Sequence, residues 1–395
     1  MTTPLAGAAP ARPPFWNDPA VRALVFQALA LIAVIALGWY LVHNTQQNLA
    51  QRGIASGFGF LNNAAGFGIV QHLIDYSPAD SYGRVFWIGL LNTLLVSVLG
   101  IVFATVLGFV VGIARLSRNW LVAKIAMVYV EIFRNIPLLL QIFFWYFAVL
   151  RTVPNPRNSL AFGDAFFLNI RGLYVPRPVF GDDFVWVLGA LALAVVLAAL
   201  LGRWARQRQA TTGQPFPVFL VSLAILVVLP GVTYFAAGQP LTWDIPKLAG
   251  FNFRGGWVVI PELAALLVAL TLYTATFIAE TVRAGILSVS HGQTEAAGAL
   301  GLPNGLTLRL IVIPQAMRVI IPPLTSQYLN LAKNSTLAAA IGYPDLVATF
   351  AGTVLNQTGQ AIETIAITMS VYLALSLGIS MLMNWYNKRK ALVER

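Results

Sequence analysis

The sequence has 395 residues, of which 58% are hydrophobic and only 10% are charged, a balance that excludes a water-soluble domain of this size and predicts an integral membrane protein. The formal charge of +11 does not require nucleic acid, because basic residues beside hydrophobic spans follow from the positive-inside rule. Since the chain contains no cysteine, disulfides, thiolate catalysis and Cys-ligated metals are excluded within it.

Eight stretches of the chain approach or exceed the roughly 20 apolar residues needed to cross a bilayer. They are residues 21–42, 85–114, 121–150, 185–202, 216–235, 257–286, 306–331 and 364–386. We therefore predict about eight spanning helices. The first is too long for the core of a signal peptide and has no clear cleavage site, so we expect it to be retained.

The positions of the charges predict the orientation. If the N-terminus lies inside and the chain crosses about eight times, the basic clusters fall on the cytoplasmic face and both termini are cytoplasmic. The clusters are Arg115/Arg118/Lys124, Arg203/Arg206/Arg208 and Lys388/Arg389/Lys390, whereas Asp75, Asp80, Asp164, Asp182, Asp183 and Asp244 fall mostly outside.

Two long polar segments, 44–84 and 151–183, face outward in this topology and are large enough to contact another molecule. The first contains GFGFLNNAAGFG, which lacks the spacing of a nucleotide fingerprint and receives no cofactor role. Residues 185–202 are almost purely Ala, Leu and Val, which suits a lipid-facing helix. The polar residues of the other spans make the second, third, sixth, seventh and eighth helices the expected core. The first, fourth and fifth are expected at its periphery.

The third span carries ionisable and amide side chains, which are costly in lipid. Glu131 and Arg134 share one helix face, Asn135 and Gln141 follow, and Pro137 is expected to weaken or kink the helix. These residues either line a translocation path or mark a cytoplasmic interface that precedes a span beginning near residue 136. Both interpretations stay open.

Two later spans repeat the pattern. Glu280 and Arg283 are three residues apart near the end of the sixth span, where helix-end ion pairing is a stronger explanation than a path. In the seventh, Pro322 and Pro323 are expected to break a helix. Lys333, Asn334, Ser335 and Thr336 follow them, either on a translocation path or near the outer interface. A lone ammonium at mid-bilayer costs roughly 2.5–3.5 kcal/mol, so we expect Lys333 to have a polar neighbour.

No motif predicts catalysis. The chain has no GxxxxGK[ST] loop for nucleotide hydrolysis and no metal-binding spacing among its three histidines, so no catalytic residue, metal ligand or cofactor is expected. Energy for transport would have to come from another protein.

The stretch HGQTEAAGALGLPNGLTLRLIVIP differs from the rest of the chain. Ser290 and Gln293 fit a capping box, and Gly301 followed by Pro303 fits a helix stop. The expected helix of about ten residues is about 15 Å long, too short to span, and the charge pattern places it in the cytoplasm. Its small residues leave the backbone open to close approach.

This stretch resembles the EAA signature of ABC importer permeases, EAA-x3-G-x9-I-x-LP, with Ile313 where Leu is usual. In that family the loop is the coupling helix that inserts into a cytoplasmic ATPase. The resemblance implies that Glu295, Ala296, Ala297, Gly298 and Gly301 form the contact and that Pro314 shapes the next helix. Glu295 would orient the coupling helix by hydrogen bonding, and Gly301 would allow its tight exit turn.

The resemblance extends along the chain. VEIFRNIPLLLQ, IAETVRAGI and LAKNSTLAAAIG look like core segments of the polar amino-acid (HisMQ-type) subfamily, and the additional parts are similar to the larger permeases of general L-amino-acid importers, the AapQ and BztB type. It implies an all-α polytopic membrane protein with a five-helix MetI-like core and three peripheral helices. The implied parts are a tail 1–20, an extra helix 21–43, outer segments 44–84 and 151–183, core parts 85–150 and 257–387 with coupling loop 286–308, an inserted helix pair and loop 184–256, and a tail 388–395.

The resemblance also implies the function and the partners. The chain would be a permease importing L-amino acids, broad or polar and acidic, across a bacterial inner membrane. A sister permease, two ATPase subunits that bind ATP and Mg, and a periplasmic amino-acid-binding protein would assemble with it.

Two other classes of function make different predictions. A self-powered secondary transporter predicts an inverted internal repeat, and the two halves give no convincing match. An intramembrane enzyme needs a nucleophile and base or a metal cluster at the midplane, and no set of residues in the sequence qualifies.

Overall fold

The computed structural model describes residues 19–51 and 56–390. The predicted tail 1–20 therefore lies almost wholly outside the described residues, as do the last five residues of the tail 388–395. Within the described ranges, seven helices are long and apolar enough to span a membrane, or eight if one sharply bent pair is a single span. The prediction of a polytopic helical membrane protein with about eight spans is confirmed.

The long helices follow the predicted stretches closely. They are α1 (Pro19–Gln51), α2 (Tyr82–Ala114), α5 (Phe184–Thr212), α6 (Val218–Ala236), α7 (Pro261–Leu287), α10 (Ile313–Asn334) and α12 (Ala361–Lys390). The bent pair consists of α3 (Trp120–Asn135) and α4 (Leu138–Phe143), the latter continued by η3 (Phe144–Leu150). The shorter helical segments are η2 (Phe58–Asn62), η4 (Pro156–Asn158), α8 (His291–Ala299), α9 (Asn304–Thr307), η5 (Leu308–Val312), η6 (Ser335–Ile341), η7 (Val347–Val354) and α11 (Leu355–Thr358).

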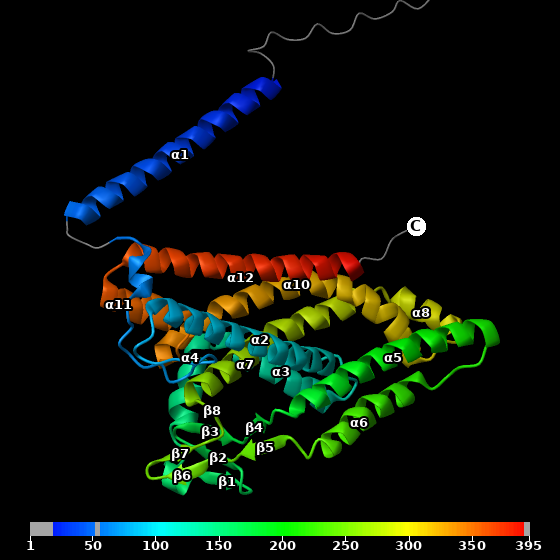
Figure 1. The fold of residues 1–395 in the computed structure, drawn as a ribbon. Coiled ribbons are helices and arrows are strands. Elements are labelled where there is room, and N and C mark those ends of the chain that lie inside the picture. Colours follow the sequence, from blue (N-terminus) through cyan, green and yellow to red (C-terminus); the bar gives the residue numbers. More distant parts are fainter. Residues whose placement is uncertain (1–18, 52–55, 391–395) are drawn as a thin grey trace, which may run out of the picture.

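Five spans form the core: α2, the α3–α4–η3 unit, α7, α10 and α12 (Figure 1). The most extensive contact between two spans joins α2 and α7. A Cβ built on Gly108 would lie 2.6 Å from the Cβ of Ile278, and one on Gly112 would lie 2.7 Å from the carbonyl oxygen of Ala279. Small residues let two membrane helices pack backbone against backbone, where dispersion contacts rather than water exclusion stabilise the pair.

The other three spans are peripheral, as predicted. The described side chains of α1 are almost all exposed. Helices α5 and α6 pack mainly against each other and lie beside the core as a pair (Figure 1). Their large apolar side chains, such as Trp186 and Phe219, are exposed, which suits contact with lipid.

Short strands gather at one end of the bundle (Figure 1). They are β1 (Leu160–Phe162), β2 (Phe166–Asn169), β3 (Gly172–Val175), β4 (Arg177–Phe180), β5 (Leu241–Asp244), β6 (Lys247–Ala249), β7 (Asn252–Arg254) and β8 (Trp257–Val259). All pairs are antiparallel: a four-stranded sheet in the order β1-β2-β3-β8, and the two-stranded pairs β4-β5 and β6-β7. We call this end the strand end and the opposite one, where α8 lies, the α8 end.

These strands were not predicted from the sequence. Sheet pairing joins the segment 151–183 to the chain that follows α6, as in the register of Tyr174 with Val258. Each strand has only three or four residues, too few to show an alternating pattern. The partners are far apart in sequence, so no local signal links them.

The first polar segment is folded over the strand end of the core. Phe60, Ala65 and Ile69 are buried with Phe350 of η7 in one apolar cluster. The backbone N–H of Gly57 donates to the Glu363 carboxylate at 2.6 Å, which fastens the segment to the first turn of α12. The segment is therefore part of the fold rather than a loose loop.

The expected break at Pro322 and Pro323 is wrong, because α10 continues through both residues to Asn334. Both prolines are exposed, whereas Ile320 and Ile321 beside them are buried. A Cβ on Gly285 of α7 would clash with Ile320, so α10 packs tightly against α7 just before the two prolines. This packing keeps the helix intact despite two missing N–H donors, as neighbouring helices allow in membrane proteins.

Candidate functional site

The helix α8 has nine residues and follows α7 after a short turn. Its N-terminus lacks the predicted capping box. The Ser290 side chain makes no capping hydrogen bond, and only its carbonyl accepts, from the backbone N–H of Gln293 at 3.0 Å. The Gln293 side chain instead accepts a hydrogen bond from Gln315 Nε2 at 3.4 Å, which links α8 to the first turn of α10.

The C-terminus of α8 forms the predicted stop. Gly301 has φ +74°, the left-handed region that glycine adopts without strain. The N–H of Leu302 donates to the carbonyl of Ala297 at 3.1 Å, and that of Gly301 to the carbonyl of Gly298 at 2.9 Å. This pair of bonds is a Schellman motif, which ends the helix and satisfies carbonyls at its C-terminus.

One face of α8 is anchored and the other is open. Ala297 is 1% exposed, whereas Ala296, Gly298 and Ala299 are exposed and Leu300 is 81% exposed. Glu295 is also exposed, and its Oε1 lies 3.0 Å from the Nδ1 of His291 one turn earlier. The open face thus offers small residues, one carboxylate and one large apolar side chain.

The chain passes from α8 into the membrane through α9, η5 and α10. Pro314 lies in the first turn of α10, and the turn before it is a wide π-helical one, Leu308–Val312. Proline has no N–H for the preceding turn, and such irregular turns are a common local adjustment. Thr307 is buried and donates to the Pro303 carbonyl at 3.3 Å, which holds the entry turn together.

The polar residues of the third span lie around a sharp break. α3 and α4 meet at an angle of 103° at residues 136–137, so the predicted effect of Pro137 is confirmed. Gln141 is buried and its Nε2 donates to the carbonyls of Phe133 at 2.8 Å and Ile136 at 2.9 Å. This amide replaces backbone donors that the break removes.

Glu131, Arg134 and Asn135 lie on α3 before the break and are exposed. Asn135 Nδ2 donates to the Glu131 carbonyl at 2.7 Å, and the Arg134 guanidinium lies 5.3 Å from the ring centre of Phe277. Exposed polar groups of this kind on a membrane helix need a protein neighbour, water or the interface beside them.

Glu280 forms ion pairs at the α8 end of α7. It contacts Arg115, which follows α2, and Arg283, whose Nη2 lies 2.6 Å from the carboxylate. The side chains of Arg115 and Glu280 are 14% and 30% exposed. The ion pairing expected at this helix end is therefore present, and it ties α2 to α7.

Lys333 lies in the last turn of α10, towards the strand end, and is exposed. Within the described part of the chain its ammonium has no hydrogen bond or ion pair, so the polar neighbour that we expected is not supplied by these residues. Ser335 is buried and donates to the Ala332 carbonyl at 2.8 Å, and Thr336 donates to the Lys333 carbonyl at 2.8 Å. Asn334 caps the 3-10 helix η6 with its backbone only.

One buried polar cluster was not predicted from the sequence. Asn92 Nδ2 donates to the carbonyls of Gln71 and Pro344, both at 2.9 Å, and the Thr93 hydroxyl accepts from the N–H of Leu346 at 3.0 Å. Asp345 is 1% exposed and accepts from the N–H of Ala348 at 2.7 Å. The signal was the pair Asn92–Thr93 in an otherwise apolar run. The cluster fastens the turn between η6 and η7 to α2.

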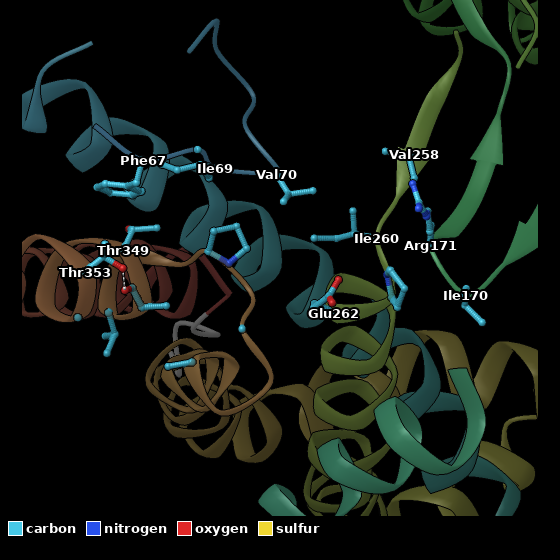
Figure 2. Close-up of a pocket in the computed structure, with 18 of the residues that line it drawn as sticks. Phe67, Ile69, Val70, Ile170, Arg171, Val258, Ile260, Glu262, Thr349 and Thr353 are labelled. Atoms are coloured by element: carbon cyan, nitrogen blue, oxygen red, sulfur yellow. Dashed lines mark hydrogen bonds between the residues drawn. The ribbon is translucent and has the colours of Figure 1, made fainter. Parts of the chain in front are cut away.

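The strand end also contains a cavity of about 960 Å³ between the sheet, the start of α7 and η7 (Figure 2). Its charged lining residues are Arg151, Arg171 and Glu262, none of which was singled out from the sequence. Within the described residues, no group of three or more His, Cys, Asp or Glu side chains is arranged to hold a metal ion.

This fold and these sites define a membrane protein with a helical core, a capped short helix exposed at one end and a charged cavity at the other. Residues 194–391 match the model of the family described as binding-protein-dependent transport system inner membrane components. The match begins inside α5 and covers the second core part. The chain belongs to this family and is a permease subunit of an ABC transporter.

Curated relatives agree over nearly the whole chain. It is 61% identical over 378 residues, 96% of both chains, to the "Putative amino-acid ABC transporter permease protein YhdX" of Escherichia coli (strain K12). It is 52% identical to the "General L-amino acid transport system permease protein AapQ" of Rhizobium johnstonii, with 100% of this chain and 98% of that protein covered. It is 44% identical to the "Glutamate/glutamine/aspartate/asparagine transport system permease protein BztB" of Rhodobacter capsulatus, with 96% of each covered.

Among solved structures, "Crystal structure of an amino acid ABC transporter with histidines" matches with a TM-score of 0.46 and 19% identity, covering 78% of this chain and 95% of that one.

Proposed function

We propose that this permease imports L-amino acids across a bacterial inner membrane. ATP and Mg would be bound by two partner ATPases, and a sister permease and a periplasmic binding protein would complete the transporter. The names of three relatives, each at least 44% identical over nearly the full chain, support amino acids as the substrate class. The charge pattern supports placing the α8 end and both termini in the cytoplasm.

The geometry of α8 is the observation that carries the proposal. Its buried side is held by Ala297, its C-terminus is fixed at Gly301, and Gln293 contacts Gln315 on α10. A partner that displaced the open face of α8 would therefore move the ends of α7 and α10 with it. The sequence-based expectation that Ala297 contacts the ATPase is corrected, because this side chain is buried against the rest of the chain. We propose that Glu295, Ala296, Gly298 and Gly301 form the ATPase contact and that Pro314 shapes the helix that receives the motion.

The translocation path is proposed to lie on the exposed polar side of the core. Glu131, Arg134, Asn135 and Lys333 are exposed on spans where lipid contact would be costly, which supports a neighbouring sister subunit or water beside them. The other candidates have partners within the chain: Gln141, Glu280, Ser335 and Thr336 make internal hydrogen bonds or ion pairs. We propose that these four, with Asn334, shape the path rather than contact the substrate.

Reconstitution tests this function. The chain would be purified with candidate sister permease and ATPase subunits, placed in proteoliposomes, and assayed for uptake of labelled L-glutamine with its binding protein. We expect uptake that requires ATP, and expect Glu295→Lys to leave the complex in the membrane but remove uptake. Uptake by the chain alone, driven by an ion gradient without ATP, would instead support the self-powered transporter.

A further inference from the structure

The cavity at the strand end contains two opposite charges held apart by one hydroxyl. Tyr146 donates its hydroxyl hydrogen to Glu262 Oε1 at 2.7 Å, and Arg151 Nη2 donates to the same hydroxyl oxygen at 2.7 Å. The carboxylate and the guanidinium are therefore linked through a single hydroxyl oxygen. They nevertheless form no ion pair, since their nitrogen and oxygen atoms are more than 4.0 Å apart.

The backbone fixes this arrangement. Tyr146 is 4% exposed in η3 and does not itself line the cavity. Arg151 follows the end of η3, and its guanidinium lies over the tyrosine ring, 5.0 Å from its centre. Glu262 is in the first turn of α7, where the helix dipole stabilises a carboxylate. Both Arg151 and Glu262 line the cavity, and Figure 2 shows Glu262 at the start of α7.

Opposite charges at such a spacing match a ligand that carries both charges on adjacent groups. An α-amino acid has an ammonium and a carboxylate on one carbon, so its ammonium can bind Glu262 while its carboxylate binds Arg151. Charge-assisted hydrogen bonds of this kind are about twice as strong as neutral ones. Arg171 on the sheet side gives the cavity a second guanidinium, which disfavours ligands whose only charge is positive.

We propose that Arg151 and Glu262, positioned by the hydroxyl of Tyr146, form a binding site for the α-carboxylate and α-ammonium of an amino acid. The site would recognise the part that all amino acids share, on the side opposite α8, before translocation. This inference rests on the proposed function for its substrate class. It adds a receiving site that is separate from the polar residues of α3 and from Lys333.

Equilibrium dialysis of the purified complex, without binding protein or ATP, tests the site. The probes are L-glutamine, 4-aminobutanamide, which lacks the α-carboxylate, and glutaramate, which lacks the α-ammonium. We expect the wild-type complex to bind glutamine and to bind neither analogue measurably. Glu262→Gln keeps an acceptor for Tyr146 but removes the charge, so glutamine affinity should fall about tenfold or more.

If Glu262 contacts the ligand's ammonium directly, its replacement should remove the preference for glutamine over glutaramate. In Glu262→Gln the affinity for glutaramate should approach that for glutamine, which a purely structural role of Glu262 would not produce. Tyr146→Phe should also weaken glutamine binding, because without the hydroxyl Arg151 and Glu262 can pair with each other. Arg157→Gln, which removes a guanidinium of the strand end outside this cavity, is the matched control and should bind as the wild type does.

Two results would overturn the site: unchanged binding and discrimination in Glu262→Gln, or loss of the sister permease from the Glu262→Gln complex, which would make the cavity a subunit interface. ATP-driven uptake by the wild-type complex is measured in parallel. If the wild-type complex shows ATP-driven uptake while the variants bind glutamine normally, only the site is refuted. If the wild-type complex shows no ATP-driven uptake, the proposed function itself fails.

Discussion

The backbone N–H of Leu302 donates to the carbonyl of Ala297 across a turn that contains Gly301, at φ +74°. This one relationship ends α8 and aims the chain back toward the membrane. Because a β-branched residue is strained in the left-handed region by about 1–2 kcal/mol, the turn depends on the residue at this position.

We expect Gly301→Val to uncouple transport while leaving the protein in the membrane. Its matched control is Gly301→Asn, because asparagine tolerates the left-handed region. In reconstituted transporters, ATP-driven uptake should be lost in the valine variant and largely kept in the asparagine variant. Equal uptake by both would show that the turn is not needed for coupling.

The contact of α2 with α7 predicts a stability effect. Gly108→Leu places atoms where Ile278 lies, at 2.6 Å from the first added carbon, and overpacking costs about 1–3 kcal/mol. The Tm of the purified protein in detergent should fall. Gly189→Leu on peripheral α5, where no atom lies within 4 Å of an added Cβ, should leave it nearly unchanged. A similar fall in both variants would contradict the assignment of core and periphery.

The ion pairs of Glu280 predict a second effect on stability. Glu280→Gln leaves Arg115 and Arg283 without their counter-charge in a partly buried site, which should destabilise the protein by about 1–3 kcal/mol. Adding Arg115→Gln should restore part of the loss in Tm. Arg177→Gln breaks an ion pair with Asp244 that is more exposed, and it should cost less than about 1 kcal/mol. No recovery in the double variant would argue against the pairing.

Asp345, in the turn between the spans α10 and α12, predicts a pH effect. Burial raises the pKa of its carboxyl from 3.8 to about 7. The folded protein therefore holds this proton more tightly than the unfolded chain, and stability falls as pH rises from about 4 to about 7. Above about pH 7 the carboxyl is ionised in both the folded and the unfolded chain, so this group no longer changes the stability.

The variant Asp345→Asn removes this titration, so its Tm should change less than that of the wild type between pH 5 and pH 8, a range set by the same pKa of about 7. Parallel pH curves for the two proteins would show that Asp345 is not the group responsible.

The sequence predicted the spans and the α8 stop because their signals are local. Long apolar runs and a glycine followed by a proline need no knowledge of distant residues. The helix α10 continues through Pro322 and Pro323, against the prediction, because packing of Ile320 against Gly285 overrides the local preference of proline. Gln141 was recognised as unusual, but its role depends on carbonyls that a 103° bend exposes.

The buried groups were harder to predict. Asn92 reaches the carbonyl of Pro344, and Tyr146 reaches Glu262, across more than a hundred residues of sequence in each case. A single polar residue in an apolar run shows that a partner is needed but does not identify it. The strands that complete the cavity are too short for their pattern to be read.

The central claim is that α8 is the contact through which an ATPase drives this permease. Because the chain has no cysteine, a single Leu300→Cys provides one defined thiol on the open face of α8, and Gln214→Cys provides another in the loop between α5 and α6 at the same end of the bundle. In the assembled complex, a short thiol-to-amine cross-linker should join Leu300→Cys, and not Gln214→Cys, to the ATPase subunit. Cross-linking from Gln214→Cys without any from Leu300→Cys would contradict the account.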